Sequence, residues 1–169
     1  MSNYITSNFS NLIFSCSVPS QWHMEHRVPD HCVVFVRQGK LLISDKGRTE
    51  EIPAGSCVFL KKDCSVRLVK ASFAGKNYEG LNIRLPQNIL EDYFQRHLKN
   101  NEFPQDFTGL SNCFMRLNRT LCLQGLLSSI ILFVEEGQDP GQEMTELKVE
   151  ELILDLLQTD IRFFPTLFD

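Results

Sequence analysis

The feature that most constrains this fold is a change of hydrophobic period at Pro86. Up to that residue, short apolar runs alternate with turn residues. Residues 32–37 are rich in β-branched and aromatic side chains, and residues 45–47 have the composition of a hairpin turn. Beyond Pro86, apolar residues recur at every third or fourth position. Strands followed by helices predict an α+β fold, with a β-sandwich or β-barrel over residues 1–85 and a helical region over residues 86–169.

Three helical segments are expected in the second part of the chain. Residues 87–97 place their large apolar side chains on one helical face. Thr120 is a suitable N-cap for an apolar helix that ends near Gly137, and a further helix is expected to open at Thr145. The polar residues 99–110 predict a loop before these two helices.

The helix expected after Thr120 is apolar almost all round, so it must bury more than one face. One face can pack on the barrel. The other needs a second copy of the chain or the helix that follows. We therefore expect a homodimer, with purely intramolecular packing as the alternative. The residues predicted for the dimer interface are Leu123, Leu127, Ile130, Ile131 and Val134.

The charge of the chain argues against direct binding to DNA. Its formal net charge of −4 divides into +2 over residues 1–115 (13 Lys and Arg, 11 Asp and Glu) and −6 over residues 116–169 (4 and 10). Neither part has the clustered positive charge that a phosphate backbone requires. One basic strip is expected to be a solvated strand edge or, alternatively, a surface for an anionic partner. It comprises Lys61, Lys62, Arg67 and Lys70.

The remaining composition predicts a cytoplasmic protein. No stretch of the sequence is apolar for long enough to span a membrane. Residues 1–4 do not begin a secretory signal, because a basic segment followed by an apolar one is missing. The six cysteines have no short C-x-x-C spacing, and three of them lie in apolar runs. We expect reduced thiols rather than a disulfide framework or a zinc site.

Turn residues in the first part of the chain match a known barrel motif. Metal-binding cupins carry the pattern G-x5-P-x-G-x2-H-x3-N, and this sequence resembles it at Gly47, Pro53 and Gly55. The metal-binding histidine of that pattern is Val58 here, and its asparagine is Lys62. The residues that shape the backbone are therefore present, whereas this ligand is replaced.

The upstream cupin pattern, H-x-H-x(3,4)-E-x6-G, is also depleted of ligands. Counted back from Gly39, Cys32 stands in place of the carboxylate and Val28 in place of the second histidine, which leaves His26 alone. One imidazole cannot hold a divalent ion in fixed geometry, so we expect no metal and no cofactor. A free-standing metal-dependent cupin enzyme is the alternative. A zinc site made of His23, His26, His31 and Cys64 is disfavoured, because the first two are expected in a loop.

The order of the parts resembles the N-terminal domain of the AraC/XylS family of bacterial transcription regulators over nearly the whole chain. Residues 55–66 are similar to the pattern G-x-x-x-F-x-R-R-G-x-x-x-V, found in the branch of the exoenzyme S synthesis activator. Lys61 and Lys62 replace the arginine pair of that pattern, and Asp63 replaces its second glycine. Residues 148–153 resemble the K-x-E-E-L-L segment of the same branch.

The resemblance implies a jelly-roll, cupin-like barrel that senses a small-molecule effector or a regulatory protein, followed by helices that dimerise. It also implies a helix-turn-helix domain that reads DNA. That domain is expected only in the parent protein, because this sequence ends at Asp169, about where a linker would begin. The chain is then a regulatory part of a transcription regulator, with activation as the commoner mode of the family and repression as the alternative, and not an enzyme.

Strand positions near the vacated metal site are expected to line any effector pocket. The candidates are His26, Val28, Phe35, Val58 and Phe59. Because side chains alternate along a strand, only one of Val58 and Phe59 can point inward. The chain contains thirteen phenylalanines, so a barrel filled by its own side chains is an equal expectation. In that case a protein partner would provide the signal.

Overall fold

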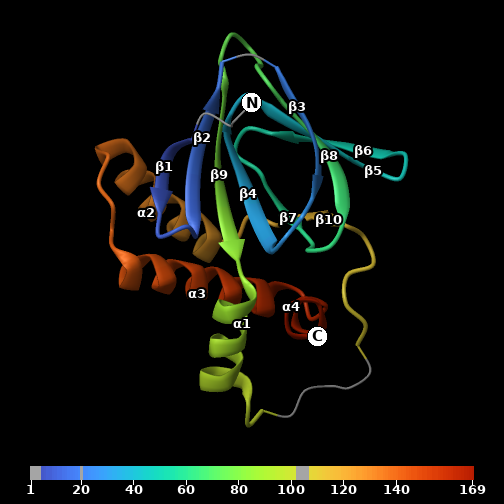
Figure 1. Ribbon diagram of the computed structural model, residues 1–169, viewed down its shortest axis with the longest axis vertical. Coiled ribbons are helices and arrows are strands. Elements are labelled where there is room, and N and C mark those ends of the chain that lie inside the picture. The colour runs from blue at the N-terminus through green and yellow to red at the C-terminus, as the bar shows by residue number, and fades with distance from the viewer. Residues whose placement is uncertain (1–4, 20, 102–106) are drawn as a thin grey trace.

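The computed structural model describes residues 5–19, 21–101 and 107–169. The strands form two antiparallel sheets, and the helices gather on one side of them (Figure 1). Residues 1–4, which carry the prediction about a secretory signal, lie outside the described residues, and so do residues 102–106 of the predicted loop. Helices and antiparallel sheets together agree with the predicted mixed class.

Within the described residues, six strands form one sheet, sheet A, and four strands form the other, sheet B. Across sheet A the order is β1 (Ile5–Phe9), β2 (Ile13–Val18), β9 (Tyr78–Leu85), β4 (His31–Gln38), β7 (Cys57–Leu60) and β10 (Phe114–Arg116). Across sheet B the order is β3 (Trp22–Arg27), β8 (Ser65–Ala71), β5 (Lys40–Asp45) and β6 (Arg48–Pro53). The hairpin predicted at residues 45–47 joins β5 to β6, with Gly47 at φ 80°.

Sheet A is buried on both faces, which explains why its central strand β4 is a continuous apolar run. Along β4, Val34 and Val36 pack in a core between the two sheets, whereas Val33 and Phe35 pack in a second core against the helices. The molecule therefore has three layers: sheet B, sheet A and the helices.

The helical layer contains α1 (Gln87–Tyr93), a π-helical turn η1 (Phe94–Leu98), α2 (Leu121–Glu136), α3 (Gln142–Thr159) and α4 (Phe163–Phe168). Thr120 caps α2 as predicted, because its Oγ1 accepts a hydrogen bond from the Leu123 N–H at 3.0 Å. Gly137 ends α2 in the left-handed conformation at φ 62°. Among the described helices, none combines the length and the apolar character needed to cross a membrane.

The start of α3 differs from the prediction. The helix begins at Gln142, three residues before Thr145. Asp139 Oδ1 accepts a hydrogen bond from the Gly141 N–H at 2.8 Å, and Gly141 has a φ of 91°, so the turn after Pro140 is complete by that residue. Thr145 is fully buried in the first turn and donates its hydroxyl to the Gly141 carbonyl at 2.7 Å.

Three strands were not predicted: β1, β3 and β10. The prediction that His23 and His26 lie in a loop is wrong, because both belong to β3, which pairs along its length with β8. The strand could not be recognised from its sequence, because β3 contains no β-branched residue. The short β10 pairs with β7, so a segment from the second part of the chain extends sheet A. The division of the chain at residue 85 stays a prediction.

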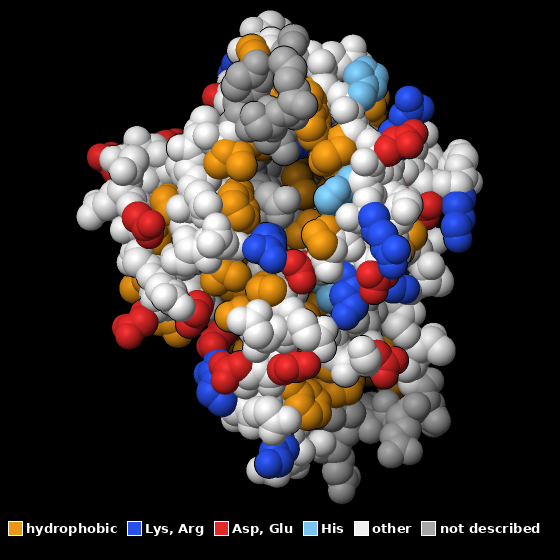
Figure 2. Space-filling view, in the orientation of Figure 1, with side chains coloured by type: hydrophobic (Ala, Val, Ile, Leu, Met, Phe, Trp, Pro, Cys, Tyr) orange, Lys and Arg blue, Asp and Glu red, His pale blue; other side chains and the backbone are white. Residues whose placement is uncertain are grey.

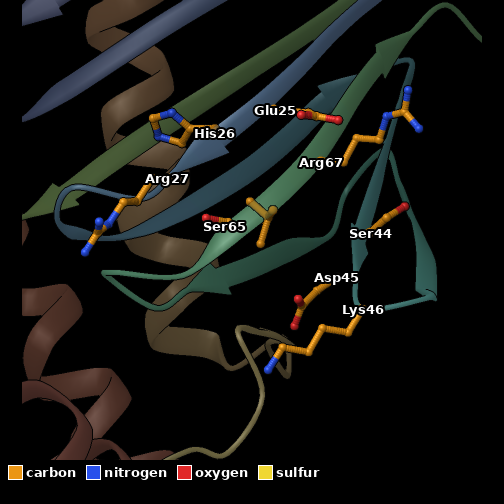
Figure 3. Close-up of a pocket in the computed structure, with 9 residues that line it drawn as sticks. Glu25, His26, Arg27, Ser44, Asp45, Lys46, Ser65 and Arg67 are labelled. Carbon is orange, nitrogen blue, oxygen red and sulfur yellow. The ribbon is translucent and has the colours of Figure 1, made fainter.

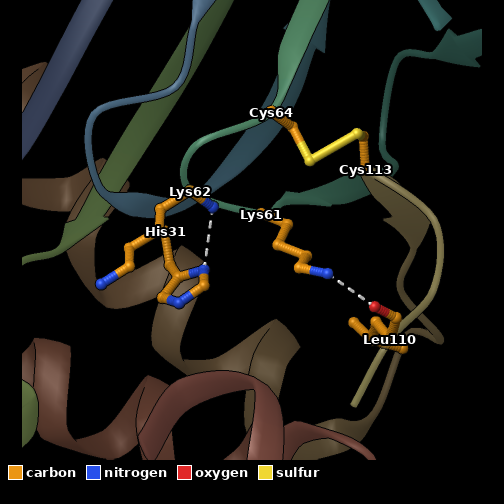
Figure 4. Close-up of a disulfide and its surroundings, with 6 residues drawn as sticks. All are labelled: His31, Lys61, Lys62, Cys64, Leu110 and Cys113. Carbon is orange, nitrogen blue, oxygen red and sulfur yellow. Dashed lines mark hydrogen bonds between the residues drawn. A yellow bond between two sulfur atoms is a disulfide. The ribbon is translucent and has the colours of Figure 1, made fainter. Parts of the chain in front are cut away.

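The expectation that all six cysteines are reduced is also wrong. Cys64 and Cys113 form a disulfide, with Cα atoms 5.6 Å apart and a sequence separation of 49 (Figure 4). The bond links the residue before β8 in sheet B to the residue before β10 in sheet A. A pair so distant in sequence has no short-spacing signature, because only the fold brings its members together. Cys32 and Cys57 are buried free thiols, and burial raises the pKa of each to about 12.

Candidate functional site

The five residues predicted to line a pocket do not surround a common space. Val28 and Val58 are fully buried between the sheets. Phe35 and Phe59 point to the opposite side of sheet A, toward the helices. The prediction that only one of Val58 and Phe59 faces the inside of the barrel is thus confirmed. His26 lies at an edge, where it lines a pocket on sheet B.

Lys70 is the unexpected residue between the sheets. Only 8% of it is exposed, so the prediction that it belongs to a solvated strip is wrong. Its Nζ lies 5.0 Å from the ring centroid of Trp22 and 5.4 Å from that of Tyr78, which are cation–π distances. The same Nζ is 3.6 Å from the Cys16 Sγ. Alternation along β8 explains the burial, because Val66 and Leu68 precede Lys70 on the same face.

Two buried side-chain polar atoms have no hydrogen-bond partner among the described residues. They are the hydroxyl of Tyr78 and the Oδ1 atom of Asn82. Both residues lie on β9, four positions apart, so they face the same side of the strand. Burial raises the pKa of Tyr78, and its hydroxyl therefore stays protonated. Buried polar groups without a partner are rare in folded proteins, and a bound ligand is one way to satisfy them.

Gly80 makes room for the Tyr78 hydroxyl. A Cβ atom at residue 80 would lie 2.5 Å from that oxygen and 3.1 Å from the Phe35 carbonyl, so a side chain there would displace the Tyr78 ring. Lys70 and Tyr78 thus supply an ammonium group and a phenol inside an apolar core, and Asn82 adds an amide on the same face of β9 as Tyr78. This inward cluster can hold one carboxylate or hydroxyl group of a largely apolar molecule. The period-two pattern of β8 and β9 was the signal in the sequence that could have identified it.

The face of the molecule in Figure 2 shows how the region between the sheets reaches the surface. Hydrophobic side chains gather in a hollow between the strands of sheet A and β3, and histidine side chains lie on its β3 side. β3 itself alternates half-buried and exposed residues, so none of its side chains is fully enclosed. Trp22 and Met24 of β3 pack against the core from this side.

The pocket beside His26 has a different character. It measures about 410 Å³ and is formed by β3, β8 and the end of β5. Its lining carries charges of both signs, and in Figure 3 the side chains of Arg27 and Arg67 point in different directions. Burial, and then the charge of Lys70, lower the pKa of His26. The pocket therefore has no convergent set of groups for one ligand.

The three N-terminal histidines do not converge either. His23 is exposed on one face of β3, and His26 lies on the other face. His31 is buried on the far side of sheet A, where its ring stacks on Phe59 with centroids 5.6 Å apart. Among residues 5–19, 21–101 and 107–169, no group of three or more His, Cys, Asp or Glu side chains could hold a metal ion.

Three of the five residues predicted for the dimer interface are instead buried inside the chain. Leu123, Leu127 and Ile130 are exposed by 2%, 5% and 2%, because they pack on sheet A and α3 within the same chain. Ile131 and Val134 are half-buried. The most exposed apolar side chains of the helical layer lie elsewhere. They include Leu121 and Leu132 on α2, and Met144, Leu147 and Leu154 on α3.

One known protein family matches most of this chain. The sequence pattern of the ExsA N-terminal regulatory domain matches residues 31–162, which confirms the resemblance found in the sequence. A search of curated protein sequences finds no match.

Two solved structures of ToxT from Vibrio cholerae share the fold. Apo ToxT K231A is 13% identical, with a TM-score of 0.66; the match covers 96% of this chain and 60% of ToxT. Wild-type ToxT with a bound unsaturated fatty acid is 12% identical, with a TM-score of 0.59 over 87% of this chain and 53% of that one. ToxT has also been solved with (E)-4-(8-methylnaphthalen-1-yl)but-3-enoic acid, at 13% identity and a TM-score of 0.54, with 87% of this chain and 57% of ToxT covered. The present chain therefore spans at most 60% of the length of these regulators.

Proposed function

Because this chain belongs to the ExsA N-terminal regulatory domain family, we propose that it is the sensing and dimerising part of a cytoplasmic transcription regulator of the AraC type. Its input is a small-molecule effector or a regulatory protein. Its output passes to a DNA-binding domain of the parent protein. The acidic charge of the helical part supports the assignment of DNA binding to another domain, since a net charge of −6 over residues 116–169 repels a phosphate backbone.

The effector that suits the inward cluster is a largely apolar monocarboxylic acid. The observation that carries this proposal is the Lys70 ammonium, buried among aromatic rings that include Tyr78, whose hydroxyl has no hydrogen-bond partner in the part of the chain that the structure describes. A carboxylate there would gain a charge-assisted hydrogen bond in a dry environment. The unsaturated fatty acid and the naphthalenyl butenoic acid bound by ToxT have this chemistry, and ToxT has the same fold.

The effector would enter from the side of β3. Trp22 and Met24 are half-buried there and can move without disturbing the fully buried residues of β4 and β7. Trp22 is also the only tryptophan in the chain, so its fluorescence reports on this place alone.

Titration with oleate below its micellar concentration tests the proposal. We expect a saturable change in Trp22 emission, and about tenfold weaker binding in both Lys70→Met and Tyr78→Phe, since each loses one hydrogen bond to the carboxylate. Lys40→Met is the matched control, because Lys40 lies on the neighbouring strand and is paired with Glu51 at 3.6 Å. Equal affinity of Lys70→Met and Lys40→Met, or no saturable signal, would contradict an acid effector at this cluster.

We also propose a homodimer, formed through the exposed apolar face of α3. Leu147 and Leu154 are 57% and 47% exposed and lie seven residues apart, so they occupy the same face of the helix. Met144 is 43% exposed one turn before Leu147. An apolar row on a water-facing helix is typical of a helix–helix interface. Ile131 and Val134 remain candidates at its margin.

A further inference from the structure

A second pocket lies where sheet A meets the start of α2. It measures about 480 Å³. One wall is the turn between β6 and β7, and the other is the segment between β10 and α2. The lining residues are Pro53, Ala54, Gly55, Ser56, Cys57, Arg116, Leu117, Asn118, Arg119, Leu123 and Leu127. Leu123 and Leu127 belong to the buried core, so they give the pocket an apolar floor.

Backbone hydrogen bonds fix both walls of this pocket. The Gly55 N–H donates to the Val36 carbonyl at 2.7 Å, and Gly55 has a φ of 90°, which favours glycine in this turn. On the other wall, the Leu117 N–H donates to the Cys57 carbonyl at 3.0 Å. The pocket is therefore bounded by ordered backbone rather than by side chains alone.

The charge of the lining is entirely positive. Arg116 and Arg119 face no carboxylate there, although this part of the chain has a net charge of −6. Arg116 donates to the Ser56 Oγ at 2.8 Å, and the Arg119 side chain has no hydrogen bond or ion pair among the described residues. Most other arginines differ, because each lies within 4.0 Å of a carboxylate. These paired arginines are Arg27, Arg37, Arg48, Arg84, Arg96 and Arg162.

The nearby acid forms no ion pair with either arginine among the described residues. Asp155 is buried and accepts a hydrogen bond from the Thr120 Oγ1 at 2.9 Å. It lines an adjacent pocket of about 170 Å³, which shares Arg116 but not Arg119. The N-terminus of α2, immediately after Thr120, adds its own partial positive charge on this side.

We propose that this pocket binds a small organic dianion, a phosphate monoester or a dicarboxylate with a compact apolar body. Two guanidinium groups match two negative charges, and each can donate a pair of parallel hydrogen bonds to an oxyanion. The leucine floor accepts the apolar body. Such a ligand would tie the β6–β7 turn to the start of α2. The site is separate from the inward cluster and does not depend on the proposed effector.

Calorimetric titration with phenyl phosphate tests this site. We expect saturable binding with a Kd of about 1 mM or tighter, and about tenfold weaker binding in Arg119→Gln and in Arg116→Gln. Arg27→Gln is the matched control, because Arg27 is an exposed arginine on β3 of sheet B and is paired with Asp63 of the β7–β8 turn. Inorganic phosphate should bind more weakly than phenyl phosphate, since it has nothing to place on the leucine floor. Lys70→Met should bind phenyl phosphate like the unmodified chain.

A second variant leaves both arginines in place. Ala54 is exposed at the rim of the pocket, and Ala54→Glu brings a carboxylate to the two guanidinium groups. We expect it to abolish binding, whereas Gln21→Glu, an exposed site on the border of β3, should not. Amide shifts on titration should concentrate at residues 53–57 and 116–120. No saturation with phenyl phosphate, equal binding by Arg119→Gln and Arg27→Gln, or shifts centred elsewhere would each overturn the proposal.

Discussion

His31 connects three parts of the molecule through one imidazole ring. Its Nδ1 accepts a hydrogen bond from the Lys62 N–H at 3.0 Å (Figure 4). Its ring stacks on Phe59, and Phe59 in turn meets Phe163 of α4 edge-on at 5.0 Å. Burial first, and then the charges of Lys62 and Lys61, lower the pKa of His31 to about 4, against smaller opposing effects of the Thr166 backbone and Asp30. A protonated ring could not accept the hydrogen bond from Lys62.

The lowered pKa predicts a loss of stability in mild acid. Between pH 6.5 and pH 4 the unfolded chain binds a proton that the folded chain does not, so the free energy of unfolding falls as the pH falls. The contribution of His31 should be about 2 kcal/mol smaller at pH 5 than at pH 7. Urea melts at both pH values measure this difference. In His31→Asn the pH dependence should shrink, whereas exposed His23→Gln should keep it; the same slope in all three proteins would contradict this role.

At the scale of single elements, the leucines of α2 and α3 are expected to divide into core and interface. Leu127→Ala should lower the free energy of unfolding by about 2–5 kcal/mol, because Leu127 is buried against sheet A. Leu132→Ala on the same helix is the control, and it should change stability by about 0.5 kcal/mol or less, since Leu132 is 62% exposed.

The dimer proposed for α3 predicts a change in mass rather than in stability. Leu147→Glu with Leu154→Glu should convert a dimer to a monomer in sedimentation velocity, because two charges would enter an apolar interface. The monomeric variant should retain its helix content by circular dichroism. If the double variant sediments like the unmodified chain, α3 is not the interface.

The helices show what local sequence can and cannot predict. Thr120 and Gly137 bound α2 as predicted, because a cap is a property of a few neighbouring residues. The inward face of α2 was predicted to contact a second copy of the chain. The hydrophobic period of the helix indicates that Leu123 and Leu127 are buried, but it does not indicate which element covers them. β3 escaped prediction because its partner β8 lies some forty residues away. The period-two pattern of β8 and β9 could assign Lys70 and Tyr78 to inward faces, but only the placement of the two strands in the two sheets brings them together.

At the scale of the whole molecule, the disulfide joins the start of β8 in sheet B to the start of β10 at the edge of sheet A. Cys113→Ser should lower the free energy of unfolding by about 2–4 kcal/mol, because the bond closes a loop of 49 residues that the unfolded chain would otherwise leave open. Dithiothreitol should lower the stability of the unmodified chain by the same amount and leave that of Cys113→Ser unchanged. Cys122→Ser, at an exposed free thiol, is the control. An equal effect of dithiothreitol on both proteins would rule out this contribution.

Sheet A separates two compartments that are both filled, and this limits how the interior can expand. A ligand that widens the space between the sheets next to Val58 has to push β7 toward the helices. The neighbouring side chain, Phe59, then presses on Phe163 of α4. A displacement of β7 moves the side chains on both of its faces together, because neighbouring residues project to opposite sides of the strand. A ligand bound between the two sheets would therefore shift α4, at the carboxyl-terminal end of the chain, without any hinge.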